Sequence, residues 1–158
     1  MLATMKAVRI LHTYPYLRVR NAAAAIAFYS EVFGAVETLR LAETSGRIGH
    51  AELRIGETAI MLADEHPELG IVGPATLGGT SVGLHLHVTN VDALAQKAVA
   101  AGATITRPLQ NQFYGERTCA IRDPFGHDWL LGEQIEEVSP TEMQRRYWEL
   151  TKPPNPPE

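Results

Sequence analysis

The chain has 158 residues, of which 45% are hydrophobic and 20% are charged, a composition that suits a folded domain with a sizeable core and excludes a disordered chain. Its net charge of -4 and its isoelectric point near 5.9 argue against nucleic acid and anionic membranes as partners. Its single cysteine, Cys119, excludes an intrachain disulfide and favours a reducing, cytoplasmic location.

The start of the chain carries no targeting signal that we recognise. Residues 1–6 lack the long apolar core of a secretion signal. No apolar run anywhere approaches the roughly 20 residues that a membrane helix needs. We therefore expect a protein without a membrane segment.

The first predicted unit spans residues 13–63. It begins with a short segment of alternating apolar residues, which is typical of a strand. Asn21 follows as a helix-capping residue, apolar side chains then recur every three or four residues as far as Phe33, and Gly34 ends the predicted helix. Three further strands are predicted at 36–41, 49–55 and 59–63.

The second predicted unit, residues 81–135, repeats these signals about 70 residues later. Asn90 takes the capping position and Gly102 ends the helix. Its later strands are predicted at 104–107, 117–122 and 128–132. The constant offset indicates an internal duplication, so we expect residues 1–158 to form a single domain of two β-α-β-β-β units.

Two segments lie outside the duplication. Residues 64–80 are rich in glycine and proline and are predicted to be a loop that joins the units. A capping box with proline at the first helical position, Ser139–Glu142, predicts a C-terminal helix over 139–150. The proline-rich tail at 152–158 is predicted to be disordered.

Several segments together resemble a known family. They are Tyr14–Val19, Ala25–Tyr29, Phe33–Ala35, Gly49–Leu53, Met61–Glu65, Tyr114–Arg117 and Asp123–Trp129. They are similar to the vicinal oxygen chelate superfamily (glyoxalases, bleomycin-resistance proteins and extradiol dioxygenases), and to its PhnB-like branch, over residues 13–146. The resemblance implies an α+β fold in which two βαβββ modules form a curved mixed sheet around a cup. It also implies a homodimer.

The resemblance also implies where a divalent metal would bind. Its ligands in the superfamily are usually His, Gln or Glu, one in the first and one in the last strand of each unit. The four matching positions here are Tyr14, Met61, Gly83 and Leu130. Because these residues offer no usual set of ligands for a divalent cation, we expect no family metal site and no cofactor.

Four polar residues remain as candidates for chemistry. By strand parity, His85 and His87 share the face of Gly83, and His50 and Glu52 share a face of another strand. They can serve as catalytic acid and base or hold a metal at an atypical site. They can also simply be polar residues that line the cup and bond to each other and to water, because spacing alone is weak evidence for chemistry. Glu116 and Arg117 can form an ion pair at the start of a strand, although surface charges are usually solvated and contribute little. Cys119, His127 and Trp129 are predicted to be structural.

The other candidates for ligand contact are aromatic or apolar. They are Tyr14, Tyr16, Met61, Leu130, Phe113 and Tyr114. Aromatic rings suit flat or cationic organic ligands through stacking. The leading hypothesis is a protein that binds a small organic molecule, such as an aromatic one, without the family metal. The alternatives are a metal-free or atypically metallated isomerase or lyase that uses the histidines and Glu52 as acid and base, and an interaction module.

Overall fold

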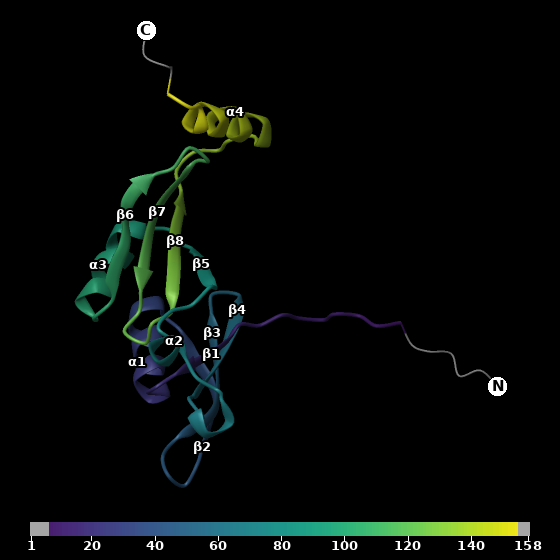
Figure 1. Cartoon of the computed structure of the whole chain (residues 1–158), viewed down its shortest axis with the longest axis vertical. Helices are drawn as coiled ribbons and strands as arrows, with labels where there is room; N and C mark the ends of the chain where they lie inside the picture. Colours follow the sequence, from purple (N-terminus) through teal and green to yellow (C-terminus); the bar gives the residue numbers. More distant parts are fainter. Residues whose placement is uncertain (1–6, 155–158) are drawn as a thin grey trace, which may run out of the picture.

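The computed structural model describes residues 7–154, which form two βαβββ modules of similar build (Figure 1). The first module contains β1 (Tyr16–Val19), α1 (Ala22–Phe33), β2 (Val36–Ala42), β3 (Ile48–Ile55) and β4 (Thr58–Asp64). The second contains β5 (Gly83–His87), α3 (Val91–Ala100), β6 (Thr104–Asn111), β7 (Glu116–Arg122) and β8 (Asp128–Gln134). The predicted α+β fold with two modules is therefore confirmed.

Each module has its own four-stranded mixed sheet. The strand orders are β1-β4-β3-β2 and β5-β8-β7-β6, and only β1 with β4 and β5 with β8 run parallel. The strand that follows each helix is thus at the far edge of its sheet. The first strand lies beside the last, so side chains from the ends of each module meet on one face.

The helices α1 and α3 of the two modules begin in the same way. The side chain of Asn21 accepts a hydrogen bond from the amide of Ala24, and Asn90 does the same for Ala93. A carboxylate from the last strand satisfies a further amide at each start: Asp64 binds the amide of Ala22, and Glu133 binds that of Val91. Gly34 ends α1 in the left-handed conformation, with φ of 66°, as predicted.

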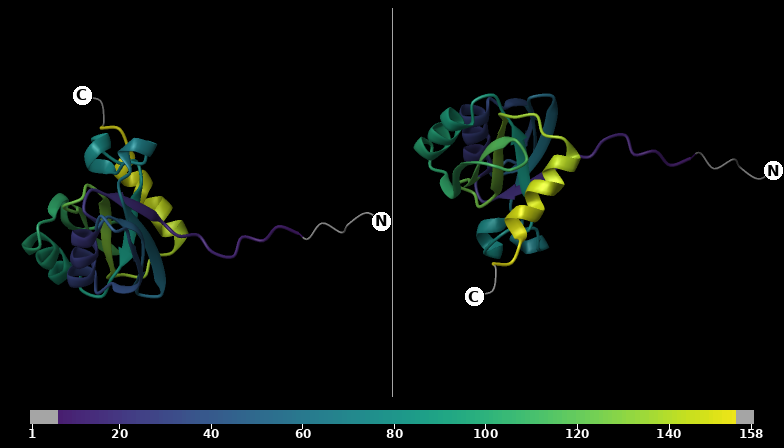
Figure 2. Two further views of the ribbon diagram at one scale, coloured as in Figure 1. Left: turned by 90° about the horizontal axis from the view of Figure 1, so that it is seen from below. Right: turned by 90° about the horizontal axis from the view of Figure 1, so that it is seen from above.

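The core lies between the helices and the sheets. Figure 2 shows α1 and α3 side by side on one side of the molecule, with the C-terminal helix α4 (Pro140–Thr151) on the other. Trp129 and Cys119 are buried, as predicted. Each sheet has one surface that α1 and α3 do not cover, and we call these two surfaces the helix-free faces.

One buried carboxylate joins the modules. Asp123 accepts hydrogen bonds from the hydroxyl of Tyr29 on α1, at 2.6 Å, and from the indole of Trp129 on β8, at 2.9 Å. Its other oxygen binds the amides of Phe125 and His127. Burial, together with the charge and hydrogen bond of Asp123, raises the pKa of Tyr29 well above its ordinary value. The imidazole of His127 is 3.0 Å from the carbonyl of Arg18, which agrees with its predicted structural role.

The segment predicted as a joining loop contains two short helical turns. Pro67–Leu69 forms a 3-10 turn and α2 spans Pro74–Leu77. Each begins with a proline, whose fixed φ suits a first helical turn, and each ends at a glycine with positive φ. These local signals shape the segment without making it part of either sheet.

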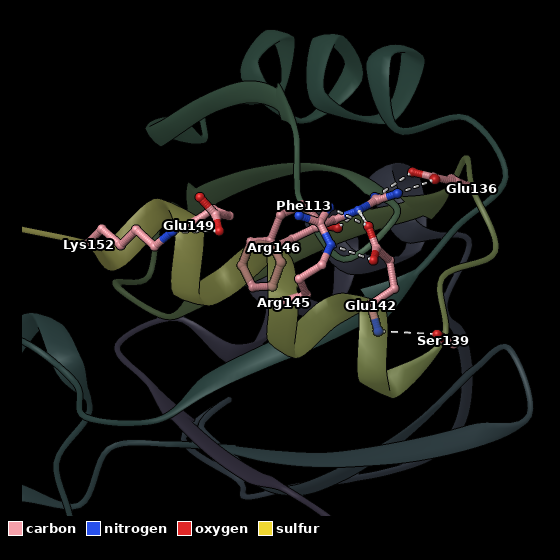
Figure 3. Close-up of polar contacts among 8 residues, drawn as sticks. All are labelled: Phe113, Glu136, Ser139, Glu142, Arg145, Arg146, Glu149 and Lys152. Atoms are coloured by element: carbon pink, nitrogen blue, oxygen red, sulfur yellow. Dashed lines mark hydrogen bonds and ion pairs between the residues drawn. The ribbon is translucent and has the colours of Figure 1, made fainter.

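Figure 3 shows the polar contacts of the helix α4. None of the residues of α4 is buried. Arg146 binds the carboxylates of Glu136 and Glu142 and the carbonyl of Phe113, and the ring of Phe113 stacks on Tyr147. The apolar side chains of Trp148 and Leu150 are exposed. Within residues 7–154, no helix is long and apolar enough to cross a membrane. Part of the predicted disordered tail, residues 155–158, lies outside the described residues, as does the N-terminal stretch 1–6.

Candidate functional site

A row of hydrogen-bonded side chains crosses the helix-free face of the first module. Strand register places Met61 of β4 between Tyr16 of β1 and Glu52 of β3. The hydroxyl of Tyr16 lies 2.7 Å from Nδ1 of His50, and Nε2 of His50 lies 3.1 Å from Oε1 of Glu52. With Glu52 as a carboxylate, Nε2 donates to it and Nδ1 accepts from Tyr16. We call this row the Tyr16–His50–Glu52 relay.

The relay ends at the wall of a surface cavity of about 490 Å³. Tyr16, which is 39% exposed, lines this cavity together with Arg18, His127 and residues 72–74 and 77–81. The guanidinium of Arg18 lies 5.4 Å from the centre of the Tyr16 ring. Among the described residues, no carboxylate forms an ion pair with Arg18. The cavity therefore presents an aromatic ring beside an uncompensated positive charge.

A different polar group occupies the helix-free face of the second module. His85 and His87 project from the same face of β5, and their rings stack at 4.4 Å. Glu116 reaches them from β7, on the far side of β8. Its Oε2 is 3.7 Å from Nε2 of His85, and its Oε1 is 3.5 Å from Nδ1 of His87. We call these residues the His85–His87–Glu116 cluster.

Gly132 of β8 makes room for this cluster. A Cβ atom at position 132 would lie 2.7 Å from Oε2 of Glu116 and 2.8 Å from Nε2 of His85. The same Oε2 is buried and has no hydrogen-bond partner among the described residues. A buried acceptor left in this state costs about 1–3 kcal/mol, so the cluster as it stands lacks a positive or hydrogen-bonding group.

The structure brings together some of the sequence-predicted site residues and separates others. His50, Glu52, Tyr16 and Met61 lie together in the first module, and Leu130 lies beside His85 in the second. His87 lies with His85 on the same face of β5, and the remaining three predicted residues lie elsewhere. Tyr14 precedes β1, stacks on His12 and lines a separate cavity, whereas Phe113 and Tyr114 lie in the turn between β6 and β7, where Phe113 meets α4.

The positions at which the resemblance implies metal ligands do not fit a metal ion. Met61 and Leu130 supply a thioether and a hydrocarbon, and Gly83 supplies no side chain. Tyr14 stacks on an exposed imidazole before the first strand begins. No step of chemistry through a metal at these positions is supported by the side chains present.

The place of Glu116 beside His85 and His87 was not foreseen from the sequence, and Glu116 and Arg117 do not form the ion pair that the sequence allowed. Arg117 instead forms a bidentate ion pair with Asp92 of α3, in which two guanidinium nitrogens each donate to one carboxylate oxygen at 2.8 Å. This hydrogen-bonded contact lowers the pKa of Asp92. Neighbouring residues of a strand point to opposite faces, so strand parity would have placed Glu116 on the face of Thr118, away from Arg117.

Comparisons of the sequence and of the fold with known proteins point to the same superfamily. Residues 9–131 match the sequence model of the Glyoxalase/Bleomycin resistance protein/Dioxygenase superfamily. Uncharacterized protein Mb0911c of Mycobacterium bovis is 44% identical over 133 residues, which cover 82% of this chain and 88% of that protein. Among solved structures, TioX from Micromonospora sp. ML1 is 27% identical, with a TM-score of 0.59 over 82% of this chain and 100% of that one. A glyoxalase/bleomycin resistance protein/dioxygenase family enzyme from Burkholderia phytofirmans PsJN is 26% identical, with a TM-score of 0.60 over 77% and 97%.

Proposed function

This chain belongs to the Glyoxalase/Bleomycin resistance protein/Dioxygenase superfamily, and from that membership we propose that it binds a small organic molecule without the family's usual metal. One observation carries the proposal. The half-exposed ring of Tyr16, fixed by His50, and the unpaired guanidinium of Arg18 line the same cavity of about 490 Å³.

The chemistry of this cavity favours a planar molecule with an anionic group. A flat ring can stack on Tyr16, and a carboxylate can form a bidentate pair with Arg18. The volume falls in the range of about 300–1,000 Å³ that is usual for small-molecule sites. An aromatic carboxylate would satisfy both groups at once.

A test compares binding of aromatic carboxylates, such as benzoates, with that of neutral aromatic compounds of the same size, by calorimetry. We expect the carboxylates to bind more tightly, and we expect Tyr16→Ala and Arg18→Met each to weaken binding by about tenfold or more. Arg40→Met, which removes an arginine of β2 that is paired with Glu37 of the same strand, is the matched control and should leave binding unchanged. Equal affinity in Arg18→Met and the wild type would contradict the proposal.

The relay favours a second candidate function, an isomerase or lyase that works by acid–base catalysis. A ligand proton can pass to the oxygen of Tyr16 while the tyrosine's own proton passes to Nδ1 of His50. The carboxylate of Glu52 would stabilise the resulting imidazolium. The histidines of the second module, His85 and His87, are further acid–base candidates in this function.

Tyr16→Phe separates the two functions. This variant keeps the ring for stacking but removes the hydroxyl that carries the proton. The binding function predicts that it retains most ligand affinity. The catalytic function predicts, in addition, a loss of turnover of about 100-fold or more with affinity retained. Unchanged turnover in Tyr16→Phe would remove the catalytic candidate.

We further infer a cytoplasmic homodimer of the PhnB-like branch. Apolar side chains stand exposed on the edge strand β2 (Val36, Leu39 and Leu41) and on α4 (Trp148 and Leu150). Such surfaces are commonly covered by a partner. The single buried cysteine is compatible with a reducing compartment. Light scattering at micromolar concentration should give twice the mass of one chain, and a monomer under these conditions would contradict the inference.

A further inference from the structure

We propose that His85, His87 and Glu116 bind a divalent transition-metal ion such as Zn²⁺, at a place separate from the family's ligand positions. One ligand atom from each residue can be chosen so that all three lie within 4.8 Å of one another. The three side chains come from two strands, β5 and β7, that are held in register by β8 between them. The rigid part of the second module therefore positions the donors.

The distances within the cluster suit an ion better than direct hydrogen bonds. The two imidazole-to-carboxylate separations are 3.7 Å and 3.5 Å, longer than the 2.7–3.2 Å of a well-formed N–H···O bond. Ligand bonds of about 2.0–2.1 Å in a tetrahedral site place neighbouring donor atoms about 3.3 Å apart. Each imidazole nitrogen would have to move about 0.2–0.4 Å closer to its own carboxylate oxygen of Glu116 to reach that spacing.

Two further observations indicate that something belongs between these side chains. Oε2 of Glu116 is buried without a partner among the described residues, although its carboxylate reaches toward both imidazoles. Gly132 lies beneath the cluster, where any side chain would displace that oxygen and the His85 ring. A bound cation would satisfy the oxygen and use the space that Gly132 leaves.

His66 also has carboxylates nearby, and its surroundings show how such a cluster is satisfied by a positive charge. His66 lies 3.8 Å from Glu43 and 3.5 Å from Glu68. There, the guanidinium of Arg47 binds both His66, at 2.7 Å, and Glu68, at 2.8 Å, and so supplies the positive charge. Within residues 7–154, no arginine or lysine forms an ion pair with Glu116, and that charge is missing from the second-module cluster.

The donor set defines the class of ion. Two imidazoles and one carboxylate suit Zn²⁺, Ni²⁺ or Co²⁺, whereas Mg²⁺ prefers oxygen ligands throughout. Three protein ligands leave a tetrahedral position for water or an oxygen atom of a ligand. His85 and His87 are both exposed on the helix-free face, so that position is open to solvent. This inference does not depend on which molecule binds beside Tyr16.

The test uses the untagged, metal-free full chain and titrates it with Zn²⁺ by calorimetry and with Co²⁺ by visible absorption. We expect one equivalent of Zn²⁺ to bind and the Co²⁺ complex to absorb as a tetrahedral species. Glu116→Gln and the double variant His85→Ala/His87→Ala should bind more than about 100-fold more weakly. Gly132→Ala, whose new methyl group meets only the ends of two flexible side chains, should bind about tenfold more weakly while keeping its thermal stability.

The matched control is His66→Ala, which removes a histidine beside two carboxylates but leaves the cluster intact. Its Zn²⁺ affinity should stay within twofold of the wild type. The proposal is overturned if the wild type binds no Zn²⁺ at millimolar concentration, or if the double variant binds as tightly as the wild type. Binding of Mg²⁺ in preference to Zn²⁺ would also contradict it. These outcomes leave the aromatic-carboxylate test untouched, so the two proposals fail separately.

Discussion

The helix-free faces of the two modules differ in how their polar groups are satisfied. In the first module, Tyr16, His50 and Glu52 form a continuous hydrogen-bonded row. In the second, His85 and His87 approach Glu116 without forming short bonds, and one carboxylate oxygen has no partner among the described residues. The first arrangement is complete as it stands, whereas the second has room for an added ion.

The scaffold beneath these faces is nearly the same in the two modules. Each helix begins at an asparagine cap, and each receives a carboxylate from the last strand of its sheet. The comparison teaches that the repeated backbone and its caps set where side chains stand. The residue types on the helix-free faces then decide what each module can bind.

The largest expected effect comes from breaking the contact that joins the modules. Asp123→Ala should lower the free energy of unfolding by about 3–5 kcal/mol, because it leaves the Tyr29 hydroxyl and the Trp129 indole buried without an acceptor. Tyr29→Phe removes only one of these bonds and should cost about 1.5–3 kcal/mol. Urea denaturation measures both. A loss below about 1 kcal/mol for Asp123→Ala would show that the modules are held together by other contacts.

The same contact predicts a response to alkaline pH. The pKa of Tyr29 is raised in the folded state, so its neutral form is stabilised by folding. That contribution is fully present below the unfolded pKa of about 10 and is lost as the pH rises through the higher folded value. Chemical denaturation above pH 10 should therefore show a steeper loss of stability for the wild type than for Tyr29→Phe. Parallel curves for the two proteins would contradict this assignment.

The equivalent capping carboxylates give a direct comparison between the modules. Asp64 binds the amide of Ala22 at 2.7 Å and that of Ile48 at 2.8 Å, whereas Glu133 binds one amide within residues 7–154, that of Val91, at 3.0 Å. We expect Asp64→Ala to cost about 2–3 kcal/mol and Glu133→Ala about 1 kcal/mol. Thermal denaturation of the two variants tests the order. A larger loss for Glu133→Ala would mean that the second module depends more on its cap.

The smallest expected effect is local and concerns α4, which only the second module carries. Arg146→Met removes the bonds to Glu136, Glu142 and Phe113. It should speed amide hydrogen exchange in 140–151 and leave exchange in β7 and β8 unchanged. Faster exchange throughout the second module would show that α4 supports the sheet.

Acid should have the same local effect as Arg146→Met. Arg145 and Arg146 lower the pKa of Glu142 to about 2, from an ordinary value of 4.5. The bonds within α4 from Arg145 and Arg146 to Glu142 are therefore fully present above about pH 4.5 and are lost as the pH falls toward about 2. The protection of α4 amides, which is their exchange rate compared with the intrinsic rate at each pH, should fall across this range in the wild type and change less in Arg146→Met.

The fold was predictable because its signals are local and repeated. The caps Asn21 and Asn90, the helix stops and the alternating strands depend on residues close in sequence, and two copies reinforce each other. The turns within 64–80 carried a weaker local signal, since Pro67 and Pro74 suit first helical turns but the segments are short.

The site was only partly predictable. Strand parity placed His85 and His87 on one face, as the structure has them. Glu116 joins them across β8, a contact that depends on the register of three strands and on the space above Gly132. The stacking of Phe113 on Tyr147 depends likewise on where α4 returns to the turn between β6 and β7. Single-strand patterns carry no information on such contacts.

The most direct test of the difference between the modules is to follow each imidazole by nitrogen NMR during a Zn²⁺ titration. The account predicts that the signals of His85 and His87 shift together and saturate at one equivalent, while His50 in the relay keeps its shifts and its tautomer. A response at His50, or unchanged signals from His85 and His87, would contradict it.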